Sequence, residues 1–231
     1  HVAICDKDDS RLPGALWDVK TAGSAIKAAA YPVDLTQAEA IEKLVESVKN
    51  DLGPVDILIN NSGGPPPGTF EDATDEKWLF AYQLTFLSAA RMIRCVLPGM
   101  KAAGWGRIIN FTSRALREPI PNLMLSNAVR LAVGGMAKTL AAEVASSGIT
   151  VNNICPGPTS TDRAIELAAA RAGKKGIDVN AELELTAKRI PRGQLASPDE
   201  QAAAAAFLVS DLAGHITGVS LIVDGGETKA L

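Results

Sequence analysis

Short apolar runs alternate with longer amphipathic stretches along the whole chain. Five runs rich in Ile, Val and Leu cover residues 2–5, 55–60, 107–111, 149–154 and 219–223, and a weaker one covers residues 28–33. Continuous apolar runs of this length are typical of strands that are buried on both faces of a parallel sheet. With helical segments between them, they predict a doubly wound, three-layer α/β/α fold around a parallel sheet.

Helix signals lie in the intervals between these runs. Thr36-x-x-Glu39 matches a capping box that opens a helix to about residue 52, ahead of Gly53-Pro54. Ser197-Pro-Asp-Glu200 combines an N-cap serine, a proline at the first helical position and the box glutamate, so a helix is expected to residue 209. Two long helices are expected over residues 74–101 and 122–147.

The length of the chain predicts one domain. A chain of 231 residues, 47% of them hydrophobic, can bury one core, so we expect a single domain over residues 1–231. Residues 159–195 depart from the alternation, because this segment is long, charged and interrupted by glycine and proline. Ligands bind at the carboxyl ends of strands in such sheets, so we expect an insertion that forms a substrate loop. A surface excursion without function is the alternative.

Charge and composition exclude several classes of partner. The formal net charge of −3 and the pI of about 5.5 argue against binding to nucleic acid or to an anionic membrane. No apolar run reaches the ~18 residues that a membrane span needs. Two histidines and three scattered cysteines, without a C-x-x-C pair, predict no metal site and reduced thiols in a cytoplasmic protein.

Polar residues follow the first three predicted strands. Asp6 ends the first, Asp34-Leu35-Thr36 follows the second, and Asn60-Asn61-Ser62-Gly63 follows the third. Glycine in such a turn permits a positive φ and a close approach of the backbone to a ligand. At Gly63 the alternative is a plain turn without a ligand. At Asp6 the alternative is an acid at the strand end that is merely solvated.

Three further motifs follow the later strands. The run from Gly106 ends on Ser113, with Ser126 thirteen residues later and Arg130 four residues after that. Pro156-Gly157-Pro-Thr159-Ser-Thr161 follows the next strand, and Val223-Asp-Gly-Gly226 ends the last one. In this order and at this spacing, the motifs resemble those of the short-chain dehydrogenase/reductase family over essentially the whole chain.

The resemblance is strongest to the branch of β-ketoacyl-carrier-protein reductases, which includes members with Ser-Asn-Ala-x-Arg in place of Tyr-x-x-x-Lys. It implies a Rossmann-like fold, an NAD or NADP cofactor and a small-molecule carbonyl or alcohol substrate. It also implies a homo-oligomer, a dimer or tetramer, in which the helices at residues 74–101 and 122–147 pair across two-fold axes.

The resemblance implies a catalytic group of four side chains, of which this chain keeps only Ser113. Ser126 occupies the tyrosine position, Arg130 the lysine position, and Thr85, seven residues after Trp78, the asparagine position. A tyrosine pKa of about 10 can be pulled towards neutrality by a cation, whereas a serine hydroxyl is a far weaker acid. Arginine keeps the positive charge but does not pass on a proton. The catalytic site is therefore atypical.

The resemblance also assigns cofactor contacts. It implies that Asp34 and Leu35 lie beside the adenine and that Arg130 binds the ribose. The turn with Asn60, Ser62 and Gly63 would lie beside the cofactor, and the nicotinamide would be flanked by Pro156, Gly157, Thr159 and Thr161. Asp6 would accept hydrogen bonds from the ribose and repel a 2′-phosphate, which favours NAD, whereas Lys7 beside it favours NADP. We expect NAD to be preferred.

The chain departs from the family at its start. The family's Thr-Gly-x-x-x-Gly-x-Gly turn, whose amides hold the pyrophosphate, does not precede Asp6 and occurs nowhere later. One strand and one helix, about thirty residues, make up such a unit. We therefore expect the natural protein to have this unit, and the 231-residue chain to form a Rossmann-like sheet that lacks its first strand and helix, with an interruption at an interior position.

Three functions remain open from the sequence. The first is an NAD(P)-dependent oxidoreductase similar to 3-oxoacyl-carrier-protein reductases, with an atypical catalytic site. The second is a catalytically inactive binding, regulatory or assembly protein, which the loss of three of the four catalytic groups favours. The third is a non-redox lyase similar to the halohydrin dehalogenases, which also use arginine in place of lysine. Those lyases keep the tyrosine, so Ser126 argues against the third function.

Overall fold

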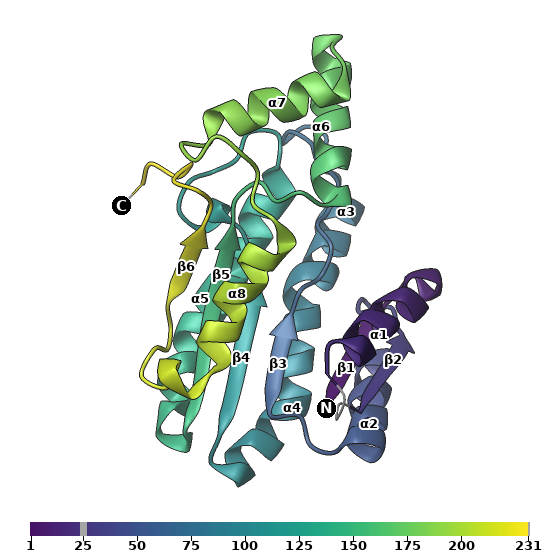
Figure 1. Cartoon of the computed structure of the whole chain (residues 1–231), viewed down its shortest axis with the longest axis vertical. Helices are drawn as coiled ribbons and strands as arrows, with labels where there is room; N and C mark the ends of the chain where they lie inside the picture. The colour runs from purple at the N-terminus through teal and green to yellow at the C-terminus, as the bar shows by residue number, and fades with distance from the viewer. Residues whose placement is uncertain (24–26, 231) are drawn as a thin grey trace.

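The strands form two parallel sheets. The computed structural model describes residues 1–23 and 27–230 (Figure 1). The smaller sheet pairs β1 (Val2–Asp6) with β2 (Ala28–Pro32). The larger sheet has the order β3-β4-β5-β6, with bounds Ile57–Asn60, Gly106–Phe111, Ile149–Pro156 and Ser220–Val223. Every pair is parallel, which confirms the predicted α/β fold with a doubly wound parallel sheet.

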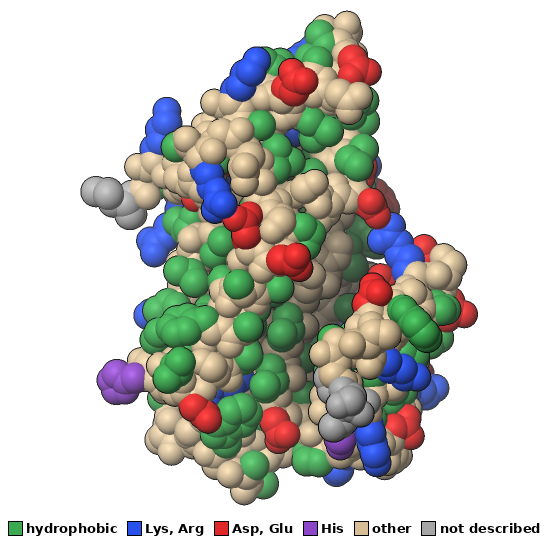
Figure 2. All heavy atoms as spheres, viewed as in Figure 1, with side chains coloured by type: hydrophobic (Ala, Val, Ile, Leu, Met, Phe, Trp, Pro, Cys, Tyr) green, Lys and Arg blue, Asp and Glu red, His purple; other side chains and the backbone are tan. Residues whose placement is uncertain are grey.

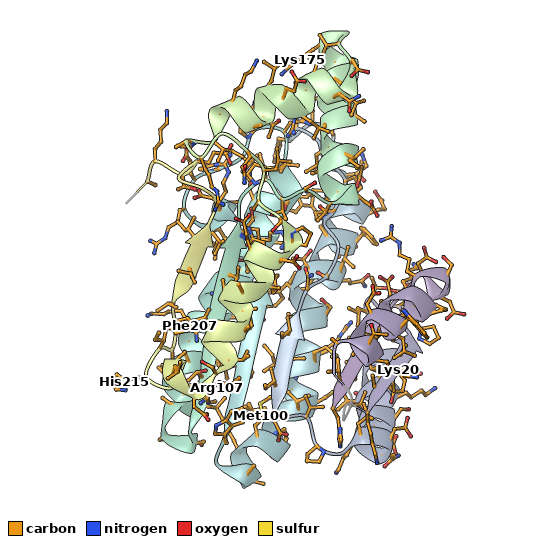
Figure 3. All side chains as sticks on the ribbon, in the orientation of Figure 1. Lys20, Met100, Arg107, Lys175, Phe207 and His215 are labelled. Atoms are coloured by element: carbon orange, nitrogen blue, oxygen red, sulfur yellow. The ribbon has the colours of Figure 1, made fainter. Side chains whose placement is uncertain are left out.

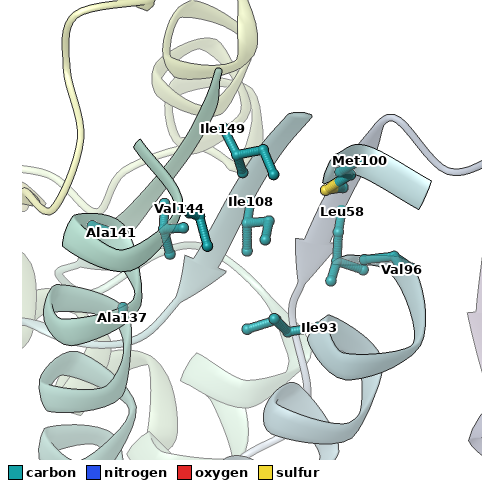
Figure 4. Close-up of a cluster of buried hydrophobic side chains, with 10 residues drawn as sticks. Leu58, Ile93, Val96, Met100, Ile108, Ala137, Ala141, Val144 and Ile149 are labelled. Carbon is teal, nitrogen blue, oxygen red and sulfur yellow. The ribbon is translucent and has the colours of Figure 1, made fainter. Parts of the chain in front are cut away.

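Helices cover both faces of the larger sheet (Figure 1). On one face, Ile108 packs among residues of α4 (Ser88–Ala103) and α5 (Met124–Val144), as Figure 4 shows. On the other face, Ile109 packs against α8 (Pro198–Val209). Ile108 and Ile109 are both fully buried, which explains why the strand is apolar at successive positions and not only at alternate ones.

The remaining helices frame this core. The smaller sheet carries α1 (Leu12–Thr21) and α2 (Ala38–Leu52), while α3 (Asp75–Ala81) leads through a π-helical turn, Tyr82–Leu87, into α4. The predicted helix over residues 74–101 is therefore one helix with a π turn inside it. Short 3₁₀ turns lie at Asp9–Arg11, Arg114–Leu116, Ala145–Ser147 and Asp211–Ala213.

The two predicted capping boxes have different outcomes. Ser197 Oγ accepts from the Glu200 amide (3.2 Å) and the Glu200 carboxylate accepts from the Ser197 amide (2.8 Å), so the second box is confirmed. The first box is wrong, because α2 begins at Ala38 and its N-cap, Gln37, makes no side-chain cap bond. The hydroxyl of Thr36 instead donates to Asp34 Oδ1 (2.7 Å), which also accepts from the Thr36 amide (2.9 Å).

The sheet is interrupted between β1 and β3. Residues from the edges of both strands, among them Ile4 and Ile59, line one cavity of about 440 Å³. On β3, Ile57 is 42% exposed and Ile59 is 47% exposed. An interior interruption is what the sequence predicted for a sheet without its first strand and helix. It leaves two strand edges unpaired and an apolar face of β3 uncovered.

Residues 159–195 contain two helices that the sequence analysis did not anticipate. The helices α6 (Asp162–Lys175) and α7 (Val179–Arg189) lie beyond the carboxyl ends of β3–β6 (Figure 1). Glu182 is fully buried between them and accepts from Arg171 Nε (2.9 Å) and Lys175 Nζ (2.7 Å); Lys175 is labelled in Figure 3. The two cations lower the pKa of Glu182 and stabilise the packing of α6 against α7.

The described residues contain neither a membrane-spanning helix nor a cluster of metal ligands. Within residues 1–23 and 27–230, no helix is long and apolar enough to cross a membrane. In the same ranges, no group of three or more His, Cys, Asp or Glu side chains could hold a metal ion. His215 lies at the end of the larger sheet that is opposite α6 and α7 (Figure 3).

Candidate active site

The cavity between the two sheets is the centre of the candidate site. It brings together six of the residues singled out from the sequence, namely Asp6, Leu35, Asn60, Ser62, Thr85 and Arg130. Its other lining side chains include Asn110 and Thr112 of the β4 end. The structure does not place Gly63, Asp34, Ser113, Ser126, Pro156, Gly157, Thr159 or Thr161 in the lining.

Arg130 links the lining of this cavity to Ser126 and to the end of β4. It lies one helical turn after Ser126 on α5, and its Nε donates to Ser126 Oγ (3.1 Å). Its Nη1 donates to the carbonyl oxygens of Phe111 (3.0 Å) and Thr112 (2.7 Å) at the end of β4. Ser126 is buried, and because its oxygen accepts from Arg130, its own hydroxyl hydrogen is available to another acceptor.

The charge of Arg130 has no acidic partner among the described residues. All three of its hydrogen-bond acceptors are neutral oxygens. Burial, together with the nearby positive charge of Arg163, lowers the pKa of the Arg130 guanidinium to about 10. Arg130 therefore remains a cation at neutral pH and can polarise the Ser126 hydroxyl.

Ser113 lies where β4 passes into the next turn. Its backbone is extended, and its Oγ accepts from the Ala115 amide (3.1 Å) as the N-cap of the short helix Arg114–Leu116. The preceding residue, Thr112, donates to the Ile154 carbonyl (2.9 Å) and so holds this strand end against β5. Ser113 is half-buried and its hydroxyl hydrogen remains available for a ligand.

Thr85 lies in the π turn between α3 and α4. The residue is buried, its side chain lines the cavity, and its Oγ1 has no hydrogen-bond partner in the described part of the chain. Buried hydroxyls are rarely left unpaired, so an unpartnered one that faces a cavity indicates a contact with water or with a ligand. π turns are frequent at functional sites because they redirect side chains within a helix.

A ladder of amide side chains crosses the larger sheet beneath the site. Asn60 Nδ2 donates to Asn110 Oδ1 (2.9 Å), Asn110 Nδ2 to Asn153 Oδ1 (3.1 Å), and Asn153 Nδ2 to Ser220 Oγ (3.1 Å). The four residues are direct neighbours in the strand register. Sequence analysis singled out Asn60 alone, although Asn110 and Asn153 stand towards the ends of two predicted strands and could have been found from that position.

The acidic residues lie at the β1 and β2 end of the site. Asp6 is exposed, and its Oδ1 accepts from the Asp8 amide (2.8 Å). Asp34 Oδ2 pairs with Lys7 Nζ at 2.8 Å, and hydrogen bonds from Lys7 and Thr36 lower the pKa of Asp34 to about 2. Among the described residues that line the cavity, Asp6 is the one carboxylate.

The segment after β5 packs tightly but lies outside the cavity. A Cβ on Gly157 would lie 2.5 Å from Asp224 Cβ, so this position requires glycine. Thr159 Oγ1 donates to the Gly157 carbonyl (3.1 Å), and Thr161 Oγ1 donates to the Thr159 carbonyl (3.3 Å). These threonines therefore stabilise the turn that leads to α6.

Neither tyrosine stands in for the missing acid. Tyr82 stacks on Phe86, with 5.2 Å between ring centroids, and does not line the cavity. Tyr31 donates to Asp51 (2.8 Å), and burial together with this acid raises the pKa of Tyr31 to about 12. Arg114 is neutralised by Glu227, with 2.9 Å between Nε and Oε2.

The interrupted α/β sheet, with polar side chains gathered at the carboxyl ends of its strands, defines a dinucleotide-binding type of fold. A family model described as enoyl-(acyl carrier protein) reductase matches residues 1–228. The chain is 35% identical over 210 residues to D-beta-hydroxybutyrate dehydrogenase of Cupriavidus necator, covering 90% of this chain and 81% of that protein. It is 37% identical over 194 residues to the 3-oxoacyl-[acyl-carrier-protein] reductase FabG of Haemophilus influenzae, covering 84% and 76%.

Two solved structures share the fold. L-sorbose reductase from Gluconobacter frateurii, complexed with NADPH and L-sorbose, has a TM-score of 0.93 and 34% identity, covering 100% of this chain and 88% of that one. An NADPH-bound short chain oxidoreductase from Pseudomonas aeruginosa PAO1 that contains an atypical catalytic center has a TM-score of 0.88 and 29% identity, with the same coverage. The chain belongs to the short-chain dehydrogenase/reductase family.

Proposed function

We propose that this protein is an NAD(P)-dependent oxidoreductase that interconverts a carbonyl and an alcohol on a 3-oxoacyl-type substrate. The observation that carries the proposal is the hydrogen bond from Arg130 to Ser126, at the boundary between the cavity and the Ser113 side of the β4 end. The names of the two curated relatives, a D-beta-hydroxybutyrate dehydrogenase and a 3-oxoacyl-[acyl-carrier-protein] reductase, support the substrate class.

The residues at the carboxyl-terminal end of the cavity, beyond the two unpaired strand edges, fit a dinucleotide. Leu35 offers an apolar contact for adenine, Asp6 an acceptor for ribose hydroxyls, and Thr85 an unpartnered hydroxyl. Arg130 would donate to the second ribose, and the turn from Pro156 would flank the nicotinamide. The negative charge of Asp6 favours NAD, because it would repel the 2′-phosphate of NADP.

Catalysis would rest on polarisation of the substrate oxygen. The nicotinamide, when bound, supplies the hydride that the carbonyl carbon receives. The hydroxyl groups of Ser126 and Ser113 would each donate a hydrogen bond to the carbonyl oxygen. Arg130 donates a hydrogen bond to the Ser126 oxygen and so makes Ser126 a stronger hydrogen-bond donor. The charge that develops on the substrate oxygen is then stabilised by hydrogen bonds. Solvent water would deliver the final proton, because serine is too weak an acid and Arg130 stays protonated at neutral pH.

One strand followed by a helix would complete the sheet between β1 and β3. Two unpaired strand edges around one cavity, and the exposed Ile57 and Ile59, support this proposal. A glycine-rich turn between such a strand and helix would present backbone amides to the pyrophosphate. We expect a strand–turn–helix unit of this kind, fused ahead of residue 1, to tighten NADH binding and to protect the β3 amides from hydrogen exchange.

Three further features support proposals about the oligomeric state, the substrate pocket and the cellular compartment. Exposed apolar side chains on α3 and α5, such as Leu79 and Leu131, support a dimer or tetramer through the long helices. The 159–195 segment, with α6 and α7 beyond the carboxyl ends of the larger sheet, is suited to forming the substrate pocket. The free thiols of Cys5, Cys95 and Cys155 support a reducing compartment such as the cytoplasm.

A catalytically inactive binding or assembly protein is the second candidate. It is favoured by the lack, among the described residues at the site, of a proton donor that is acidic enough to replace tyrosine. The decisive experiment titrates the 231-residue chain with NADH and NADPH and then adds acetoacetate or an acetoacetyl thioester. Turnover by the parent supports the oxidoreductase. Turnover only in the double variant Ser126→Tyr/Arg130→Lys, with none in the parent, supports the inactive protein.

A further inference from the structure

The chain after β6 returns to the loop that carries Ser113. It continues beyond the carboxyl end of β6 (Figure 1), and Glu227 there meets Arg114, the residue directly after Ser113. Arg114 Nη2 donates to Glu227 Oε1 in a long hydrogen bond (3.4 Å). Arg114 Nε lies 2.9 Å from Glu227 Oε2, which makes an ion pair but not a hydrogen bond. Nearby, the Lys229 amide donates to Glu118 Oε2 (3.0 Å), so the segment contacts this loop at two points.

The ion pair between Arg114 and Glu227 is buried. At this end of the molecule, many Lys, Arg, Asp and Glu side chains reach into solvent (Figure 2). The side chain of Arg114, in contrast, is only 13% exposed, and that of Glu227 only 9%. Exposed ion pairs contribute little because water screens them, whereas removing one partner of a buried pair leaves a charge without compensation. Arg114 therefore depends on Glu227 to keep its buried position.

The turn that carries Glu227 is fixed by its own hydrogen bonds. Asp224 Oδ1 accepts from the Gly226 amide (2.9 Å), and Asp224 Oδ2 accepts from the Thr228 amide (2.7 Å). Gly226 has a φ of 87°, which a residue with a side chain would rarely adopt. The direction in which Glu227 leaves the backbone is therefore set before it meets the arginine.

Ser113 is held from both sides. The Thr112 carbonyl before it accepts from Arg130 Nη1 (2.7 Å), which fixes the preceding peptide group. Arg114 after it is held by Glu227. A displacement of Arg114 would therefore rotate the Ser113 backbone about a fixed preceding peptide, and the hydroxyl would change direction.

We infer that Glu227 is a positioning residue for Ser113: by binding Arg114, it keeps the Ser113 hydroxyl directed towards the substrate oxygen. The inference rests on the proposed function, because that function gives Ser113 its role as a hydrogen-bond donor. Glu227 acts through Arg114 and is not part of the cavity lining. The Ala115 amide donates to Ser113 Oγ (3.1 Å), so hydrogen exchange of this amide reports on the placement of Ser113 without any turnover.

The kinetic test measures acetoacetate reduction by NADH in variants of the ion pair. Loss of a whole oxyanion-type donor lowers kcat about 100- to 1000-fold, so a displaced donor in Glu227→Gln should lower kcat about 10- to 100-fold. The KM for acetoacetate and the Kd for NADH should stay within about twofold of the parent values, because the binding contacts remain. Glu227→Asp should recover part of the loss, since it keeps the charge.

Two further variants complete the kinetic test. The double variant Arg114→Gln/Glu227→Gln should be no slower than Glu227→Gln, because the two residues act as one unit. Glu46→Gln is the control: it removes an exposed carboxylate from α2 and should keep kcat within about twofold of the parent value.

Hydrogen exchange separates positioning from a general loss of stability. In Glu227→Gln, the Ala115 amide should exchange about tenfold faster or more, while the amides of β5 keep their parent rates within about twofold. An equal rise at Ala115 and throughout β5 would mean that Glu227 only stabilises the fold, and would overturn the inference. An unchanged rate at Ala115 would overturn it as well.

The two measurements also keep this inference apart from the proposed function. Ketone reduction by the parent, with kcat of Glu227→Gln within about twofold of it, would support the proposed function and overturn the inference. No ketone reduction by the parent, together with faster exchange confined to the Ala115 amide in Glu227→Gln, would support the placement of Ser113 by Glu227 and refute the proposed function.

Discussion

Replacing Asn110 by leucine tests the amide ladder that supports the site. Leucine has the same branching and the same number of side-chain heavy atoms as asparagine, so the change removes hydrogen bonds without opening a cavity. Asn110 is buried and makes two ladder bonds, to Asn60 (2.9 Å) and to Asn153 (3.1 Å). Asn110→Leu therefore leaves an amide donor on Asn60 and a carbonyl acceptor on Asn153 without partners. The ladder would be broken in its middle.

The expected cost follows from the burial of those two groups. A buried polar group without a partner costs about 1–3 kcal/mol. Asn153 is buried and Asn60 only half-buried, so the second group can recover water and the total should be about 2–4 kcal/mol. A chain of 231 residues unfolds with an entropy of about 0.5 kcal/mol/K. The melting temperature should therefore fall by about 4–8 °C in scanning calorimetry or circular dichroism.

Thr150→Val is the matched control. Thr150 lies on β5, is buried, and its hydroxyl has no hydrogen-bond partner in the described structure. Removing an unpaired buried hydroxyl should leave the melting temperature unchanged or raise it by about 2 °C or less. A melting temperature of Asn110→Leu within about 2 °C of the parent, or a fall in Thr150→Val as large as in Asn110→Leu, would refute the reasoning.

Three further predictions concern the cofactor, the fold and the reaction. In fluorescence titrations, the unmodified chain should bind NADH with a lower Kd than NADPH. Asp6→Asn should reduce the ratio of the NADPH Kd to the NADH Kd about tenfold, because the charge that repels the 2′-phosphate is gone. Ser197→Ala should destabilise α8 by about 1 kcal/mol in urea unfolding, because the confirmed capping box is lost; an unchanged midpoint would contradict this. The turnover rate should fall only as pH rises through about 10, where Arg130 loses its proton, and a midpoint near neutrality would point to a different acid.

Much of the fold follows from local signals in the sequence. The strands were predictable because residues such as Ile108 and Ile109 are buried on opposite faces, which produces a continuous apolar run. The helices α1, α6 and α7 were not anticipated, because Pro13 and Gly14 interrupt the first, and α6 and α7 lie in a charged segment. The π turn at Tyr82–Leu87 has no residue signature, since it depends on how the helix packs.

Several contacts at the site depend on tertiary packing and are not recorded by any local sequence pattern. Thr36-x-x-Glu39 has the composition of a capping box, but Asp34 competes for the Thr36 hydroxyl and the helix starts two residues later. Motif spacing located Ser126 and Arg130, but Arg163 meets the loop after β3 through a contact between residues 98 positions apart. Side chains brought in by long-range packing leave no local pattern in the sequence.

Ser126 and Arg130 are best understood as one unit and not as two separate losses. At i and i+4 of α5, arginine is long enough to reach back to the serine oxygen while its Nη1 holds two carbonyls of the β4 end. A lysine ammonium lacks this planar fork and could not make the three contacts in the same geometry. A tyrosine at position 126 alone would need space in a buried position that is occupied by the arginine contact. Each residue fits because of the other, so activity should respond to the paired exchange in a way that neither single exchange predicts.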